Sequence, residues 1–420
     1  MLPQEFTTYT RQIMGEERWQ RFVDAFDADT PVSIRINPFK SATTSSPSLA
    51  SASLSPTPIS HPLTDVQVPW CRNAFYLKER PNFTRDPLLH AGVYYVQEAS
   101  SMFLDTALRQ ILPDVPVQML DLCAAPGGKS TLSRAALPEG STLYSNEPNR
   151  TRANILMENL QKQGHPGVIV TNNYATDYRK AKLLFDVILC DVPCSGEGMF
   201  RKDEGAISEW SLQNVMKCAA LQRSIIEDIW QCLKPGGTLI YSTCTYNLHE
   251  NEENVRWIME TLGADIIPLA TENEWNITGS LLPEWDKPVY RFIPGKTRGE
   301  GLFMAVLRKT SDDTVLGKPS PSALRILSDG NPQPTVKGKN VIPAHAEALL
   351  INLPADKYPR TELSLDDALR YLHHEALALP ADVPKGFVVV TYQSHPLGFV
   401  KNIGNRANNL YPQEWKIRNL

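Results

Sequence analysis

The sequence lacks any apolar run that approaches the roughly 18 residues a helix needs to cross a membrane. Residues 1–15 also lack the charged-then-apolar layout of a secretory signal. With 42% apolar and 21% charged residues, the composition is that of a soluble globular protein. We therefore expect a cytoplasmic protein with no membrane partner, and 420 residues are enough for more than one domain.

Cysteine pairs of the C-x-x-C type are absent, although the chain has seven cysteines. Since such pairs are the usual mark of a structural zinc site, we expect no metal, and scattered thiols are typical of a reducing compartment. An excess of positive charge is absent too. The net charge of −4 gives no general attraction to nucleic acid, so contact with RNA has to come from local basic patches.

Two stretches combine cations with aromatic residues. The first has Arg72, Lys78, Arg80 and Arg85 among Trp70, Phe75, Tyr76 and Phe83. The second has Lys401, Arg406, Lys416 and Arg418 near Tyr411 and Trp415. A basic stretch is more often a solvated face, but the aromatic residues among the cations favour RNA binding.

Strands and helices alternate from about residue 90 onward. Apolar runs predict strands at residues 117–122, 142–145, 168–171, 185–190 and 238–242, and helical spacing predicts helices at 98–112, 131–137, 150–162, 219–233 and 247–262. Residues 289–292 and 302–307 can close the sheet as an antiparallel pair. This alternation predicts an α/β fold with a doubly wound, mainly parallel, Rossmann-like sheet.

Composition divides the chain into four parts. Residues 1–75 form a small α/β N-terminal RNA-binding domain with a Ser/Pro-rich insertion at 41–60, and residues 76–310 form the Rossmann-like domain. Residues 311–340 are rich in Ser, Pro, Gly and Asp and predict a linker. Residues 341–420 form a smaller RNA-binding domain, in which Ser364 and Asp367 cap a helix at 365–376.

A glycine turn at residues 121–130 (DLCAAPGGKS) follows the first strand of this sheet. A phosphate-binding Walker loop would need a glycine at Cys123, and a dinucleotide loop would need G-x-G-x-x-G, so neither matches. Adjacent glycines after an acidic strand end suit S-adenosylmethionine better, because its amino-acid end and ribose can approach Gly127 and Gly128 closely. An ordinary strand-to-helix turn is an equally good interpretation of these residues alone.

The ends of later strands carry polar residues that would meet at one edge of the sheet. Glu147 follows the second strand, where an acid can accept both hydroxyls of a ribose; the alternative is an acid that pairs with a helix N-terminus. Asp191 and Cys194 follow the fourth strand, and Cys244 follows the fifth.

Cys194 and Cys244 lie in polar loops, whereas Cys190 and Cys232 lie within apolar elements and are expected to be inert. Two cysteines, a carboxylate and a methyl-donor turn suggest one reaction. Cytosine C5 is too weak a nucleophile to take a methyl group directly, but a thiolate that adds to C6 activates it. A carboxylic acid facing N3 stabilises the adduct, and a base then removes the C5 proton so that the thiol can leave.

These motifs resemble the Sun/Nop family of RNA (cytosine-5) methyltransferases, and within it the bacterial 16S rRNA methyltransferase F type. The resemblance covers residues 33–37 (SIRIN), 92–102 (GVYYVQEASSM), 121–130, 191–203 (DVPCSGEGMFRKD) and 242–245 (STCT). Residues 405–412 (NRANNLYP) look like the PUA-like RNA-binding tail of that type.

The resemblance implies a role for each motif residue. Cys244 would be the nucleophile, Cys194 would assist proton removal and product release, Asp191 would face the base, and Lys129 would organise the site. S-adenosylmethionine would be held by Cys123, Ala124, Ala125, Pro126, Gly127, Gly128, Lys129, Glu147, Asn173 and Asp191. DNA cytosine methyltransferases use the Pro-Cys cysteine as nucleophile, so the choice of Cys244 comes from the resemblance and not from chemistry.

The sequence departs from the family at two positions. After the third strand the family often has an aspartate near the cofactor adenine, and here Asn173 or Asp177 could serve. Related sequences have Pro-His where this chain has Pro294-Gly295. We expect a monomer that methylates cytosine C5 in ribosomal RNA. Transfer RNA is the alternative substrate, and an RNA-binding ribosome-assembly factor without turnover is the alternative class.

Overall fold

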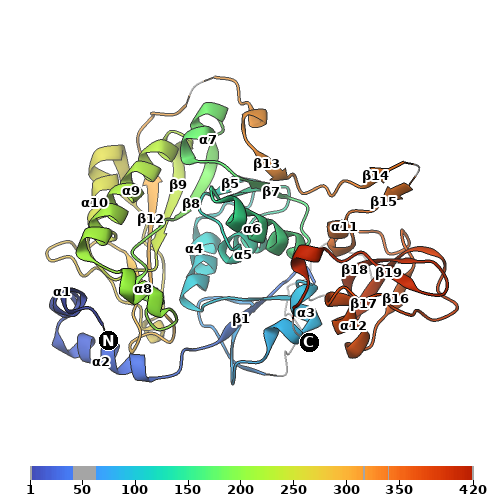
Figure 1. The fold of residues 1–420 in the computed structure, drawn as a ribbon. Helices are drawn as coiled ribbons and strands as arrows, with labels where there is room; N and C mark the ends of the chain where they lie inside the picture. Colours follow the sequence, from blue (N-terminus) through green and yellow to red (C-terminus); the bar gives the residue numbers. More distant parts are fainter. Residues whose placement is uncertain (1, 41–62, 316, 339, 419–420) are drawn as a thin grey trace.

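The computed structural model of the protein describes residues 2–40, 63–315, 317–338 and 340–418. The insertion predicted at residues 41–60 lies outside this part of the chain. Figure 1 shows a large central sheet surrounded by helices, an N-terminal part that begins with α1 and α2, and a C-terminal part that extends to one side. None of the helices in the described ranges is both long enough and apolar enough to cross a membrane.

The central sheet has nine strands in the order β10-β12-β9-β8-β5-β6-β7-β13, with β11 paired to β12. The pairs β9–β8, β8–β5, β5–β6 and β6–β7 are parallel, and antiparallel strands close both edges. The prediction of a doubly wound, mainly parallel sheet is confirmed, and so is the antiparallel pair β11–β12. The strands are β5 (Gln118–Asp121), β6 (Thr142–Asn146), β7 (Val168–Thr171), β8 (Phe185–Asp191), β9 (Leu233–Thr243), β10 (Ala264–Ile266), β11 (Tyr290–Phe292), β12 (Leu302–Lys309) and β13 (Ile326–Ser328).

Helices cover both faces of this sheet, because the strands are apolar on both sides. In β5, Met119 packs into a core with α4, α5 and α6, while Leu120 packs into a second core with α7, α9 and α10. The helices are α4 (Phe103–Ile111), α5 (Gly128–Ala136), α6 (Arg150–Gln163), α7 (Ala175–Ala181), α8 (Glu204–Glu209), α9 (Leu212–Trp230) and α10 (Glu252–Trp257).

The N-terminal part combines the helices α1, α2 and α3 with a four-stranded sheet in the order β2-β3-β1-β4. Because β4 belongs to this sheet, the N-terminal sheet extends to Val96, and the predicted division between residues 75 and 76 falls within β3. The elements are α1 (Gln4–Met14), α2 (Glu16–Asp24), β1 (Ser33–Ile36), β2 (Thr64–Gln67), β3 (Ala74–Leu77), α3 (Pro87–His90) and β4 (Tyr94–Val96).

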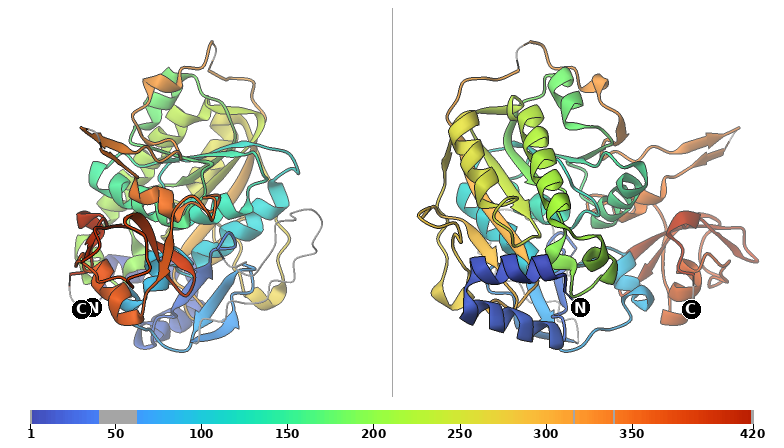
Figure 2. Two further views of the ribbon diagram at one scale, coloured as in Figure 1. Left: turned by 90° about the vertical axis from the view of Figure 1, so that its right-hand side faces the viewer. Right: turned by 60° about the vertical axis from the view of Figure 1, so that its left-hand side comes forward.

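The C-terminal part has a sheet in the order β16-β17-β18-β19 and a hairpin, β14–β15, that stands away from the rest of the chain (Figures 1 and 2). Ser364 caps α12 through Asp367 N (3.1 Å), as predicted, although α12 ends at Leu372. The elements are β14 (Thr335–Lys337), β15 (Asn340–Ile342), α11 (His345–Leu349), β16 (Arg360–Glu362), α12 (Leu365–Leu372), β17 (Gly386–Tyr392), β18 (His395–Asn402) and β19 (Ala407–Asn409).

The segment predicted as a linker contributes to the fold. Within residues 311–340, β13 pairs with β7 and forms an edge of the central sheet. Its three residues carry too short a pattern to distinguish a strand from a loop. The division of the chain into domains stays a prediction.

The predicted limits of several helices are wrong, and two of them differ most. The helix predicted at residues 219–233 starts at Leu212, where the Ser211 side chain accepts a hydrogen bond from Asn214 N, and it ends at Trp230. Leu221 of this helix is 50% exposed, so it is not on the buried face. The helix predicted at 247–262 starts only at Glu252 and continues as a π-helical turn, Ile258–Gly263.

Most aromatic residues of the two basic stretches belong to the interior, although Phe75 and Trp415 are only partly buried. Trp70, Tyr76 and Tyr411 are each only 2% exposed, so they do not present open rings to RNA. The cations of these stretches remain at the surface: Arg72, Lys78, Arg80, Arg85, Arg406, Lys416 and Arg418 are exposed, and Lys401 is half-buried. These stretches therefore offer RNA mainly charge, with Phe75 and Trp415 as the partly exposed rings.

The C-terminal end of α6 joins the three parts. The last carbonyls of a helix have no partner within it. Here Lys40 Nζ donates to the carbonyl of Lys162 at 2.6 Å, and Asn37 Nδ2 donates to the carbonyl of Gln163 at 3.0 Å. From the C-terminal part, Ile351 N donates to the carbonyl of the glycine that ends the helix, at 3.0 Å.

Two glycines allow these close contacts. Gly92 has φ +68°, and a Cβ atom there would lie 1.9 Å from the carbonyl oxygen of Lys162. Gly164, which ends α6, has φ +83°, and a Cβ atom would lie 2.1 Å from the carbonyl oxygen of Leu349. Any side chain at either position would separate α6 from its neighbour.

We predict that Gly92→Ala lowers the free energy of unfolding by about 2–5 kcal/mol, because a positive φ and a steric clash add up. Gly236→Ala is the matched control. Its φ is +73°, but no atom lies within 4 Å of the added Cβ, so only the backbone cost of about 1–2 kcal/mol applies. Urea unfolding measures both, and equal losses would contradict the role of Gly92 in docking.

Candidate active site

The glycine turn joins β5 to α5, and side chains of other elements hold it in place. Gly127, with φ +117°, precedes the helix, so α5 starts at Gly128, three residues earlier than the predicted position 131. Three carbonyls of the turn accept hydrogen bonds from side chains of β6 and α6: Leu122 from Asn146 (3.0 Å), Ala125 from Arg152 (2.9 Å) and Pro126 from Asn159 (2.7 Å). The turn thus keeps its shape without a ligand.

Two buried carboxylates flank the turn. Asp121 ends β5 and is 0% exposed; its Oδ2 accepts from Ser130 Oγ at 2.6 Å, and its Oδ1 has no partner among the described residues. Burial raises the pKa of Asp121 to about 7. Glu147 follows β6 and is 2% exposed; its Oε1 accepts from Asn149 N at 2.9 Å.

Asn173 and Asp177 are both engaged with protein atoms. Asn173 Nδ2 donates to the carbonyl of Arg325 at 3.2 Å, and its Oδ1 accepts from Arg325 N at 2.9 Å. Asp177 Oδ2 accepts from Tyr174 N at the start of α7. Asn173 therefore fastens the segment before β13, and its contact with an adenine ring stays a prediction.

Lys129 links the glycine turn to β8. Its Nζ lies 2.7 Å from Asp191 Oδ2, and Ser242 Oγ donates to Asp191 Oδ1 at 2.7 Å. Burial opposes the charged form, but the Asp191 carboxylate and its hydrogen bond raise the pKa of Lys129 above its ordinary value. The Asp191 side chain is 30% exposed, so it remains open to a ligand.

The two cysteines predicted at strand ends meet. Cys194 Sγ and Cys244 Sγ are 3.2 Å apart and hydrogen bonded. This hydrogen bond and burial together raise the pKa of Cys194 well above its usual value. Cys194 therefore favours its protonated form, while either sulfur can be the donor of the hydrogen bond. Cys190 and Cys232 are 0% exposed and lie in the core, as expected for packing residues.

Sequence reasoning missed the residues that hold the two cysteine loops together. We define the first cysteine loop as residues 192–199, after β8, and the second as residues 244–251, after β9. Glu197 of the first loop is 1% exposed, and its Oε2 accepts from Tyr246 N at 2.6 Å and Asn247 N at 3.0 Å in the second. In addition, Gly198 N donates to the carbonyl of Cys244 at 2.7 Å.

Glu250 of the second loop makes the converse contact. It is 0% exposed, and its Oε2 accepts from Ser195 N of the first loop at 3.0 Å and from Gln222 Nε2 of α9 at 2.7 Å. Each loop thus supplies a carboxylate that binds the backbone of the other. We call this arrangement the reciprocal clasp, and its residues are Glu197 and Glu250.

The clasp explains the late start of α10. Asn247 Nδ2 donates to Glu250 Oε1 at 2.8 Å, so these side chains are used within the loop and not on a helix face. A signal was present in the sequence, since residues 247–253 are too polar for the buried face of a helix. Glu197 lies in the Pro-Cys motif but had no assigned role.

The structure also accounts for glycine at position 295. Gly295 has φ +82°, and a Cβ atom there would lie 2.1 Å from the carbonyl oxygen of Arg21 in α2. A histidine at this position would push α2 away. Among the described residues, no three His, Cys, Asp or Glu side chains are grouped so that they could hold a metal ion.

We predict that Asp121 makes stability depend on pH. Its pKa is about 7 when folded and about 3.9 when unfolded, so between these values only the folded state holds the proton. Stability therefore falls as pH rises through this window. Asp121→Asn should remove this fall in stability. Between pH 4 and pH 8, the free energy of unfolding of the variant should rise relative to that of wild type by up to about 4 kcal/mol. Urea unfolding without ligand measures the effect, and Asp114→Asn, at an exposed aspartate, is the control. Parallel pH profiles of wild type and Asp121→Asn would contradict the assignment.

Comparison with known proteins follows the three structural parts. Residues 111–308 match the family described as 16S rRNA methyltransferase RsmB/F. Residues 2–99 match the N-terminal domain of 16S rRNA methyltransferase RsmF, and residues 358–417 match the RsmF PUA domain. Two solved structures from Pyrococcus horikoshii share the fold: a methyltransferase homologue (26% identity, TM-score 0.59, 73% of this chain and 95% of that one) and NSun6 with SFG (19%, 0.58, 74% and 99%).

Full-length relatives carry one name. The ribosomal RNA small subunit methyltransferase F of Citrobacter koseri is 30% identical, over 98% of this chain and 96% of that protein. That of Salmonella paratyphi C is 29% identical over the same shares. The chain belongs to the RsmF family of 16S rRNA methyltransferases, which depend on S-adenosylmethionine.

Proposed function

We propose that the protein transfers a methyl group from S-adenosylmethionine to C5 of a cytosine in 16S rRNA, through a transient covalent bond between Cys244 and C6 of the base. The observation that carries this proposal is the pair of sulfur atoms, 3.2 Å apart, at the ends of β8 and β9. They lie at the carboxyl edge of the sheet, the edge that also carries the glycine turn, and ligands bind at this edge in such folds.

The residues at the glycine turn fit S-adenosylmethionine. That molecule offers an ammonium group and two ribose hydroxyls as donors, and the site offers two buried carboxylates. Asp121 Oδ1 lacks a donor among the described residues, and Glu147 has the position of a ribose-binding acid. When bound, the cofactor supplies an electrophilic methyl group. We assign its binding to Cys123, Ala124, Ala125, Pro126, Gly127, Gly128, Lys129, Glu147, Asn173 and Asp191.

Cys244 is the better nucleophile of the two cysteines. Because the raised pKa of Cys194 makes it the poorer nucleophile, we assign the attack to Cys244. The Lys129 ammonium interacts electrostatically with Cys244 Sγ, and the thiolate is the reactive form of a cysteine. The Cys244 thiolate would add to C6, and C5 would then take the methyl group as the bond between that group and the sulfonium sulfur breaks.

Release needs two further steps at the same atoms. A base must take the proton from C5, and the bond between C6 and Cys244 Sγ must break to restore the thiolate. Cys194 lies in hydrogen-bond contact with the leaving sulfur, so we assign it to this release. The Asp191 side chain is 30% exposed and binds Lys129 and Ser242. We assign it the contact with N3 of the base.

RNA as the substrate is supported by the parts outside the central sheet. The N-terminal and PUA domains carry the exposed cations Arg72, Lys78, Arg406 and Lys416. The relatives named above act, by their names, on the small-subunit ribosomal RNA. A target cytosine has to be unstacked to enter the site, at a cost of roughly a few kcal/mol.

We predict that Cys244→Ala lowers methyl transfer at least about a thousandfold, because no group remains to activate C5. Transfer of labelled methyl groups to 16S rRNA, with bisulfite mapping of the product, measures it. Cys218→Ala is the matched control, since this partly buried cysteine on α9 lies outside the site. Full activity of Cys244→Ala would contradict the covalent mechanism.

We predict that Cys194→Ala accumulates a covalent protein–RNA adduct, because attack by Cys244 is retained and release is slowed. Denaturing gel electrophoresis after incubation with RNA and cofactor detects a band of reduced mobility. The double variant Cys194→Ala/Cys244→Ala should show none. An adduct that persists in the double variant would assign the covalent bond to another residue.

A further inference from the structure

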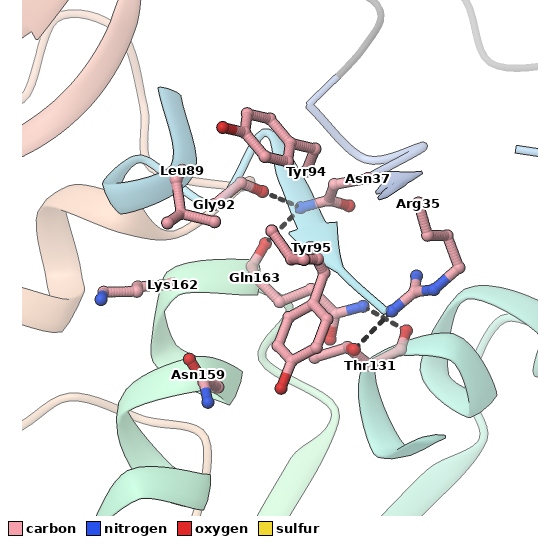
Figure 3. Close-up of a pocket in the computed structure, with 11 residues that line it drawn as sticks. Arg35, Asn37, Leu89, Gly92, Tyr94, Tyr95, Thr131, Asn159, Lys162 and Gln163 are labelled. Atoms are coloured by element: carbon pink, nitrogen blue, oxygen red, sulfur yellow. Dashed lines mark hydrogen bonds between the residues drawn. The ribbon is translucent and has the colours of Figure 1, made fainter. Parts of the chain in front are cut away.

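A cavity of about 230 Å³ lies beside α6, outside the proposed catalytic site. Its walls come from β1, the α3–β4 segment, α5 and α6, so it lies between the N-terminal sheet and the central domain (Figure 3). Pockets for drug-sized ligands have about 300–1,000 Å³. This cavity is smaller, and therefore suits one ring system and not a whole cofactor.

Arg35 gives the lining a positive charge. The lining has no Asp or Glu, and its other cation, Lys162, is paired with Glu158 Oε1 at 2.5 Å. Arg35 is only 4% exposed and donates to neutral acceptors: Gln97 Oε1 (3.0 Å), the carbonyl of Gly128 (3.3 Å) and Thr131 Oγ1 (2.5 Å). No ion pair of Arg35 occurs among the described residues. Because a buried charge without a counter-ion is costly, the cavity favours a ligand that carries negative charge.

The remaining walls suit a nucleobase. Figure 3 shows the Tyr95 ring projecting from β4 towards α5 and α6, beside Asn159 and Gln163. Gln163 is 4% exposed, and its Oε1 has no hydrogen-bond partner among the described residues. An aromatic ring offers stacking, side-chain amides offer contacts to base edges, and cations offer contacts to phosphate.

We propose that this cavity binds one unstacked nucleotide of the RNA substrate, distinct from the target cytosine, with its base on Tyr95 and its phosphate towards Arg35. This inference rests on the proposed function, because it takes RNA as the substrate. The place of the cavity in the fold supports an RNA ligand, because the cavity adjoins the PUA domain: Lys162 Nζ lies 5.3 Å from the ring centre of Trp415 in that domain.

The cavity also adjoins the glycine turn. Tyr95 Cε1 would lie 3.2 Å from a Cβ atom at Gly128, and Arg35 donates to the carbonyl of Gly128. A nucleotide held here therefore contacts the residues that shape the start of α5. This second contact would select RNAs in which a neighbour of the target is also unpaired.

Binding without turnover tests the proposal. The probes are the four ribonucleoside 5′-monophosphates and a single-stranded RNA that contains 4-thiouridine for photo-crosslinking, each added without cofactor. We expect a monophosphate to bind wild type, to be displaced by the RNA, and to bind Tyr95→Ala about 10- to 100-fold more weakly. Tyr95→Phe keeps the ring and should stay within about threefold of wild type. Crosslinks should map to the peptide that contains Tyr95.

Leu89→Trp provides a second variant, because a larger ring from α3 fills the cavity while Tyr95 stays in place. Thermal unfolding identifies a variant that fails to fold. Equal RNA binding by wild type, Tyr95→Ala and Leu89→Trp would overturn the proposal, as would a bound monophosphate that RNA does not displace. If methylation of C5 fails but this binding is seen, only the proposed function falls; if methylation occurs without this binding, only this inference falls.

Discussion

The reciprocal clasp between the cysteine loops is the interaction on which the site depends. Both loops leave the sheet at the ends of adjacent parallel strands, and neither contains enough apolar surface to pack by itself. A buried carboxylate is costly unless several donors satisfy it, and Glu197 receives hydrogen bonds from Trp210, Tyr246 and Asn247. Each carboxylate accepts hydrogen bonds from backbone N–H groups of the other loop. The loops are therefore held together without the use of the thiols. The sulfur–sulfur distance of 3.2 Å follows from this arrangement.

The end of α6 holds the N-terminal and C-terminal parts to the central domain. Its terminal carbonyls bind Lys40 and Asn37 from the N-terminal part and Ile351 from the C-terminal part. Burial lowers the pKa of Lys40 to about 7, because an ammonium group that caps a helix in the interior loses contact with water. Asn159 of the same helix donates to the carbonyl of Pro126 in the glycine turn, so α6 contacts the N-terminal part, the C-terminal part and the proposed cofactor site.

The sequence was informative wherever one short motif determines the local structure. The parallel strands, the glycine turn and the meeting of Cys194 with Cys244 could all be predicted, because strand ends converge at one edge of the sheet. The clasp could not, since it depends on pairs more than 40 residues apart (Ser195 and Glu250, |i−j| = 55) whose partners are backbone groups without a sequence signature. β13 was missed because its pairing is decided by the free edge of β7. The burial of most aromatic residues of the basic stretches was missed because composition does not reveal which side of an element is buried. The roles of the site residues still rest on the family resemblance and on chemistry.

These two constraints divide the proposed site into halves. The glycine turn, Asp121 and Glu147 belong to the half fixed by β6 and α6, while both cysteines belong to the half fixed by the clasp. Lys129 crosses from α5 to Asp191 at the end of β8 and so connects the halves by a direct ion pair of 2.7 Å. Methyl transfer needs the base and the methyl group in register within a fraction of an ångström. The Lys129–Asp191 pair therefore has a mechanical role beside its electrostatic one: it sets the distance between the half that would hold the methyl donor and the half that would hold the base.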